Sequence, residues 1–131
     1  MFYITKIENG RMNVPAPEYH DVGTADIVEG ETLALNASGL LVKNTTAPTF
    51  IAAAPAVQNA KGAPVFRITP DMVLAVPVAS GTPASLKAGA KITVATSGTE
   101  VVATTSESGI VTVVHPNGAK AVGDTVLVRF H

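Results

Sequence analysis

The chain contains no cysteine and no tryptophan, and aromatic residues make up only 5% of its 131 residues. Without cysteine it can form no disulfide, no thiolate nucleophile and no cysteine-ligated zinc site. Hydrophobic residues still make up 47% of the chain, so the apolar content consists mostly of alanine and valine. Such small side chains bury a modest area each, but a chain of this length can form a core from them without metal or disulfide.

Long hydrophobic runs and a surplus of positive charge are also missing. The apolar runs at residues 50–57 and 72–79 are far shorter than the roughly 20 residues that span a bilayer, and each contains a proline. The N-terminus shows no basic region followed by an apolar run, so we expect no signal peptide, no membrane partner and synthesis in the cytoplasm. The net charge of −1 argues against nucleic acid as a partner, because phosphate binding normally requires a basic surplus.

Charge is distributed unevenly along the chain. Residues 1–31 contain six acidic and two basic residues, whereas residues 32–131 contain four acidic and seven basic ones. An acidic leading segment could fold back on the basic body or on a neighbouring subunit, although an ordinary solvated loop has the same composition. Within this segment Glu29 and Glu31 flank a turn glycine. We expect both to face solvent, with a bound cation as the alternative.

An internal repeat is the strongest pattern in the sequence. Residues 27–46 (IVEGETLALNASGLLVKNTT) and 86–105 (LKAGAKITVATSGTEVVATT) share six of twenty positions at an offset of 59, and residues 121–128 echo the opening of the unit. Each copy has a glycine turn, an alternating strand, a Ser-Gly turn and a second strand, which indicates a β-hairpin. We therefore predict two superposable hairpins, with Gly39 and Gly98 at equivalent turn positions and with positive φ.

Turn signals recur about every ten residues, and no convincing amphipathic helix is present. We predict an all-β fold, a small β-barrel or β-sandwich of about nine or ten short strands that contains the two repeated hairpin units. Residues 23–131 are predicted to form this single β domain. Residues 1–22 are predicted to be an extended N-terminal arm, because Pro15 and Pro17 prevent both helix formation and central-strand pairing.

The predicted arm carries the candidate partner-binding residues. A terminal segment with apolar side chains but no regular pattern is more often packed on something than free. Its prolines would keep it extended, as suits a segment that lies along the surface of a partner. The predicted contact residues are Phe2, Tyr3, Ile4, Arg11, Met12, Val14 and Tyr19.

No catalytic, cofactor or metal site is recognisable in the sequence. The histidines at positions 20, 115 and 131 have no ligand spacing, and the neighbours His20 and Asp21 would point to opposite sides of an extended segment. Serine is plentiful, but no G-x-S-x-G elbow is present. We predict a non-enzymatic protein without catalytic residues, cofactor or metal.

Four segments of the sequence carry a resemblance to a known family. In chain order they are KIENGRMNVPAPEY, GETLALNASGLLVKNTTAPTFIAA, PVFRITPDMVLAVPV, and the stretch from LKAGAKITVATSGTEVVATTSESGIVTVV to AVGDTVLVRF. Together they resemble the small capsid decoration, or cement, proteins of tailed bacteriophages and prophages. The resemblance implies a β-rich structural protein that binds the major capsid protein on the outer face of the shell and strengthens the shell, often as a trimer. It also implies a location on the exterior of the virion, after synthesis in the host cytoplasm. In several such families an N-terminal segment reaches the capsid lattice, a role that would fall here on residues 1–22.

A non-catalytic β-sandwich that binds carbohydrate or mediates adhesion is the alternative. Such modules usually display aromatic platforms, of which two Tyr, four Phe and no Trp supply few. A small hydrolase or metalloenzyme on a β-barrel would need a convergent polar site, and the sequence shows none.

Overall fold

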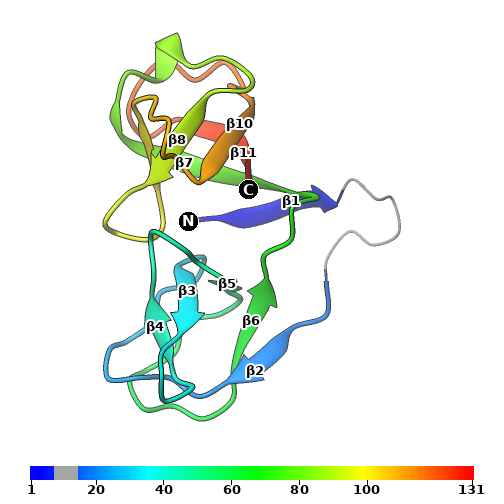
Figure 1. Ribbon diagram of the computed structural model, residues 1–131, viewed down its shortest axis with the longest axis vertical. Helices are drawn as coiled ribbons and strands as arrows, with labels where there is room; N and C mark the ends of the chain where they lie inside the picture. Colours follow the sequence, from blue (N-terminus) through cyan, green and yellow to red (C-terminus); the bar gives the residue numbers. More distant parts are fainter. Residues whose placement is uncertain (8–14) are drawn as a thin grey trace.

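The computed structural model describes residues 1–7 and 15–131 and is all-β, which confirms the predicted fold class (Figure 1). The described residues form eleven strands and one short 3₁₀ helix, η1 (Pro83–Ser85). The strands are β1 (Tyr3–Ile7), β2 (Glu18–His20), β3 (Thr32–Leu35), β4 (Leu41–Lys43), β5 (Phe50–Ala52), β6 (Ala63–Arg67), β7 (Met72–Gly81), β8 (Lys91–Val94), β9 (Val101–Ala103), β10 (Val111–His115) and β11 (Thr125–Phe130).

The strands build two five-stranded barrels that follow one another in the sequence. In the C-terminal barrel the strand order is β7-β11-β10-β8-β9, and parallel pairing of β9 with β7 closes it. In the N-terminal barrel the order is β2-β6-β5-β3-β4, and a parallel bridge between Val22 and Leu41 closes it. Strands β2, β6, β5, β3 and β4 of the N-terminal barrel thus occupy the same places as β7, β11, β10, β8 and β9 of the C-terminal barrel. The two barrels share one topology. Figure 1 shows the N-terminal barrel below, the C-terminal barrel above and β1 between them.

The two barrels also share their strand register. Leu33 pairs with Phe50 in the N-terminal barrel, and Ile92 pairs with Val111 at the same place in the C-terminal barrel. The β2–β6 ladder corresponds in the same way to β7–β11, and β5–β6 corresponds to β10–β11. The two predicted hairpins are confirmed as β3–β4 and β8–β9. They are parts of a longer structural repeat that covers nearly the whole chain.

Each barrel has its own hydrophobic core, and the smaller core repeats the positions of the larger one. All eight buried members of the N-terminal core have a counterpart in the C-terminal core by register or by the sequence repeat. The pairs are Val22/Val78, Ile27/Leu86, Leu33/Ile92, Leu41/Val101, Phe50/Val111, Ala52/Val113, Ala63/Val126 and Val65/Val128. The same alternation of inward apolar residues therefore specifies both halves of the chain.

The Ser-Gly turns of the two hairpins match as predicted. Gly39 and Gly98 have φ angles of 77° and 74°. Their N–H groups donate to the carbonyls of Asn36 and Ala95, three residues back, at 2.9 Å in both cases. Glycine adopts this left-handed conformation without the steric cost that a Cβ atom brings. The β8–β9 turn is one residue longer than the β3–β4 turn.

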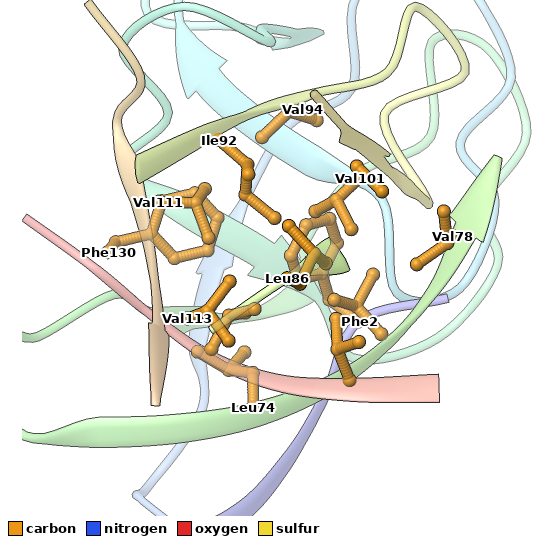
Figure 2. Packing of buried hydrophobic residues seen from close by; sticks show 14 of the residues in the cluster. Phe2, Leu74, Val78, Leu86, Ile92, Val94, Val101, Val111, Val113 and Phe130 are labelled. Carbon is orange, nitrogen blue, oxygen red and sulfur yellow. The ribbon is translucent and has the colours of Figure 1, made fainter. Parts of the chain in front are cut away.

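The described strands of the N-terminal segment pair with strands of the two barrels, which corrects the expectation of an arm outside the β domain. β1 pairs antiparallel with β7, and β2 pairs antiparallel with β6. Phe2 is 1% exposed and lies among the side chains of the C-terminal core (Figure 2). Pro15 and Pro17 precede β2 and so leave its ladder intact. Nine described strands, β3 to β11, lie within residues 23–131 as predicted, and β1 and β2 lie within the expected arm.

Glu31 is buried where the two barrels meet, so the expectation that it faces solvent is wrong. It is 3% exposed, whereas Glu29 is exposed as expected. Beside it, the Thr32 N–H donates to the Gly98 carbonyl at 2.8 Å, so the β8–β9 turn of the C-terminal barrel covers the start of β3. A turn that is repeated in the sequence thus joins the two barrels.

Candidate interaction surface

Tyr3 is exposed on β1, which lies at the edge of its sheet. β1 pairs with β7 along one side, and no other described strand pairs with it. Tyr3 is 50% exposed and Met1 is 43% exposed. Ile4 is half-buried against the C-terminal core, and the Thr5 hydroxyl donates to the Val73 carbonyl at 2.8 Å. β1 is therefore held by one face and presents the other to solvent.

A mainly apolar hollow of ≈ 180 Å³ adjoins Met1 and Tyr3. It lies between β1 and the strands β5 and β6 of the N-terminal barrel. Its lining residues are Met1, Phe2, Tyr3, Ile4, Glu29, Ile51, Ala52, Ala53 and Phe66.

The strand register brings a second exposed tyrosine onto the sheet surface that borders this hollow. Tyr19 on β2 pairs with Pro64 on β6, and Phe66 lies two residues further along β6, on the same face. Val65 between them points inward and is buried. Tyr19 is 64% exposed, and Phe66 is half-buried in the lining of the hollow. We refer to Tyr3, Tyr19 and Phe66 as the aromatic face.

The structure separates the predicted contact residues into three groups. Tyr3 and Tyr19 are exposed, and Ile4 is half-buried. The ring of Phe2 packs against that of Phe130 with 5.4 Å between centroids, so its side chain is not available to a partner. Three further predicted residues, Arg11, Met12 and Val14, lie outside the described residues.

Phe66 was not among the predicted contact residues. The signal for it lies in the alternation of β6, where Ala63 and Val65 face the core and Pro64 and Phe66 face outward. An aromatic residue at an outward position of a strand is a candidate surface contact.

A charged pair ties β2 to β6 on the face of the ladder opposite Tyr19 and Phe66. Arg67 donates to both carboxylate oxygens of Glu18, from Nε at 2.7 Å and from Nη2 at 2.9 Å. This hydrogen bonding lowers the pKa of Glu18 below its usual range. The guanidinium carbon of Arg67 lies 5.0 Å from the ring centroid of Phe50. The ring centroid of His20 also lies 5.0 Å from that of Phe50. These contacts fix the strand that presents Tyr19.

The three histidines make separate contacts. Besides the contact of His20 with Phe50, Nδ1 of His115 accepts the Asn117 N–H at 2.8 Å, and Nδ1 of His131 hydrogen-bonds the Thr112 hydroxyl at 2.7 Å. Within residues 1–7 and 15–131, no group of three or more His, Asp or Glu side chains is arranged to hold a metal ion. The same part of the chain has no helix with the length and apolar character needed to cross a membrane.

No protein-family model, curated protein or solved structure matches the chain.

Proposed function

We propose that this protein is a non-enzymatic structural protein that binds the major capsid protein on the outer surface of a tailed-phage capsid and stabilises the shell. The aromatic face carries the proposal, because Tyr3 and Tyr19 remain 50% and 64% exposed on strands that are held by pairing with β7 and β6. Large aromatic side chains that are held in place before binding are typical anchors of protein interfaces. The resemblance to decoration proteins supplies the class of partner.

The edge of β1 that pairs with no described strand gives this contact a physical mechanism. An edge strand offers N–H and C=O groups to a partner strand, while its side chains provide the specificity. A protein that binds the assembled lattice but not its separated subunits stabilises the lattice by RT ln(1 + [L]/Kd). This amounts to about 2.7 kcal/mol per site at one hundred times the dissociation constant. Many such sites on one shell would oppose its disassembly together.

The proposed location is the exterior of the virion, and the proposed assembly is a homo-oligomer, with a trimer favoured by the resemblance. Exposed apolar side chains outside the aromatic face provide further surface for subunit contacts. They include Val28 and Leu35, which are 59% and 40% exposed.

A binding experiment with matched surface variants tests the proposal. The double variant Tyr3→Ser and Tyr19→Ser is compared with Val57→Ser and Val122→Ser, which alter equally exposed apolar residues elsewhere. Each protein is mixed with capsids assembled without it, and co-sedimentation and the thermal stability of the capsid are measured. We expect the tyrosine variant to bind at least about tenfold more weakly, a loss of about 1.4 kcal/mol, and the valine variants to bind as the unaltered protein does.

Two results would contradict this assignment. If the unaltered protein does not co-sediment with capsids, the capsid function is rejected. If the tyrosine variant binds capsids as well as the valine variants do, the contact lies on another surface.

A carbohydrate-binding or adhesion module is the second candidate, because the exposed rings of Tyr3 and Tyr19 could also stack on sugars. A glycan array with the same variants distinguishes the two functions. Glycan binding that depends on the tyrosines, together with no capsid binding, would favour the second candidate.

A further inference from the structure

The two barrels share one topology, yet their equivalent surfaces differ in exposure at two places. In the N-terminal barrel residues 30–32 are buried, whereas their counterparts 89–91 in the C-terminal barrel are exposed or half-buried. The hairpin turns show the opposite difference, because Gly98 is buried and its counterpart Gly39 is exposed. Each of these two surfaces is therefore buried in one barrel and exposed in the other.

The two buried surfaces meet each other within the chain. The Thr32 N–H donates to the Gly98 carbonyl at 2.8 Å. A Cβ atom at Gly98 would lie 3.1 Å from Cγ of Glu31 and 3.3 Å from Cγ of Lys43. The β8–β9 turn of the C-terminal barrel is thus closely fitted against the start of β3 in the N-terminal barrel.

The two counterparts of this contact face solvent. Apart from its chain neighbours, no described residue has an atom within 4 Å of where a Cβ at Gly39 would lie. Residues 89–91 line an open hollow of ≈ 610 Å³ together with residues 105–107. In the described part of the chain, no loop carbonyl accepts a hydrogen bond from the Lys91 N–H, which corresponds to the Thr32 N–H.

We propose that a second copy of this chain joins these two surfaces. The β3–β4 turn, residues 36–40, of one copy docks on residues 89–91 of the next, just as the β8–β9 turn docks on residues 30–32 within one chain. The Gly39 carbonyl then accepts the Lys91 N–H, and the turn enters the hollow. Residues 36–40 carry no charge, so the lysine side chain meets no like charge and can extend to solvent.

This contact is heterologous, because it uses a different surface on each copy. Repetition of such a contact gives a ring if the rotation between copies closes and a filament if it does not. Inside the chain β1 adds to the junction, since the Phe2 N–H donates to the Gly30 carbonyl at 3.1 Å. Among the described residues no strand covers Gly89 in this way, so association between copies is expected to be weaker and to depend on concentration. The inference does not rest on the proposed capsid function.

Cross-linking tests the contact directly, because the chain has no cysteine of its own. Single variants Ser38→Cys and Lys91→Cys are prepared separately, mixed and oxidised. The control mixture pairs Ser38→Cys with Lys120→Cys, which alters another exposed lysine. We expect a covalent heterodimer from the first mixture and several-fold less from the control. Equal yields from the two mixtures, or no heterodimer from either, would overturn the proposal.

Sedimentation velocity tests the contact without a covalent bond. The variant Ala37→Arg places a long charged side chain on the turn, and Ala121→Arg makes the same change at an exposed site outside the contact. We expect self-association of the unaltered protein, an increase of at least about tenfold in the dissociation constant for Ala37→Arg, and no change for Ala121→Arg. A monomeric unaltered protein at several hundred micromolar, or equal effects of the two variants, would reject the contact.

Discussion

The rings of Phe2 and Phe130 lie 5.4 Å apart at an angle of 43°, so the second residue of the chain and the second-to-last pack in one core. Phe2 is 1% exposed and Phe130 is 6% exposed. Residues 1–7 therefore contribute to the stability of the C-terminal barrel, which is synthesised after the N-terminal barrel.

Replacing Phe2 with alanine should destabilise the protein by about 3–5 kcal/mol, because a large buried aromatic side chain is removed and leaves a cavity. Tyr3→Ala, at the next residue, is the matched control. Tyr3 is half-exposed, so its loss should change the free energy of unfolding by no more than about 0.5 kcal/mol. Urea unfolding of both variants measures the difference. Equal losses would mean that Phe2 does not belong to the core.

Deleting residues 1–7 should destabilise the C-terminal barrel more than the N-terminal one, because it removes β1 from β7 and Phe2 from the larger core. Amide hydrogen exchange, read separately for β3–β6 and β8–β11, measures the effect. Faster exchange is expected first in the C-terminal strands. Unchanged protection there would indicate that β1 contributes little to this barrel.

Substitution of the two equivalent turn glycines by alanine should have unequal effects. Both have positive φ, so each alanine should cost about 1 kcal/mol in backbone strain. At Gly98 the added methyl group also meets Glu31, Lys43 and Thr32 at 3.1–3.3 Å, and overpacking adds about 1–3 kcal/mol. Urea unfolding midpoints of Gly39→Ala and Gly98→Ala test this order. Equal midpoints would show that the junction between the barrels accommodates the methyl group.

Replacing Glu31 with glutamine should stabilise the protein at neutral pH. Burial raises the pKa of Glu31 and outweighs the opposing effects of the Val28 backbone and Lys43, and its Oε2 is buried without a hydrogen-bond partner in the described structure. A carboxyl whose pKa is raised by folding destabilises the folded state as pH rises from the unfolded pKa, about 4.3, through the folded pKa.

Thermal unfolding at pH 7.5 and pH 4 measures this dependence. Glu31→Gln should be more stable than the unaltered protein at pH 7.5, by about 1 kcal/mol or more, and the difference should shrink at pH 4. Glu29→Gln is the control, because Glu29 is exposed. A stability gain that is the same at both pH values would contradict the role given to the buried charge.

The sequence predicts the hairpin repeat because the turn glycines and the alternating strands are local features. It does not predict that the remaining strands repeat as well, because equivalent core positions hold side chains of different size. Phe50 corresponds to Val111, and Ala63 corresponds to Val126. A core can exchange large and small side chains between positions if its total volume and pattern are kept, so the repeat is visible in the register but not in the residues.

The sequence likewise predicts only part of the candidate interaction surface. The aromatic side chains of Tyr3 and Tyr19 identified them as candidates, and their contact with a partner remains a prediction. Phe2 was misplaced because the strand that buries it, β7, is distant in the sequence. Glu31 was misplaced for the same reason, since the turn around Gly98 that covers it belongs to the other barrel.

The pairing of β1 with β7 also determines the order in which the chain can fold. The Thr5 hydroxyl and the Val73 carbonyl that it contacts are 68 positions apart. At roughly 5–20 residues per second, a ribosome needs seconds to make the sequence between them. The N-terminal barrel ends at Arg67, so all of its strands are synthesised before the partner of β1 exists. β1 is synthesised before every strand of the N-terminal barrel and is nevertheless among the last strands to dock.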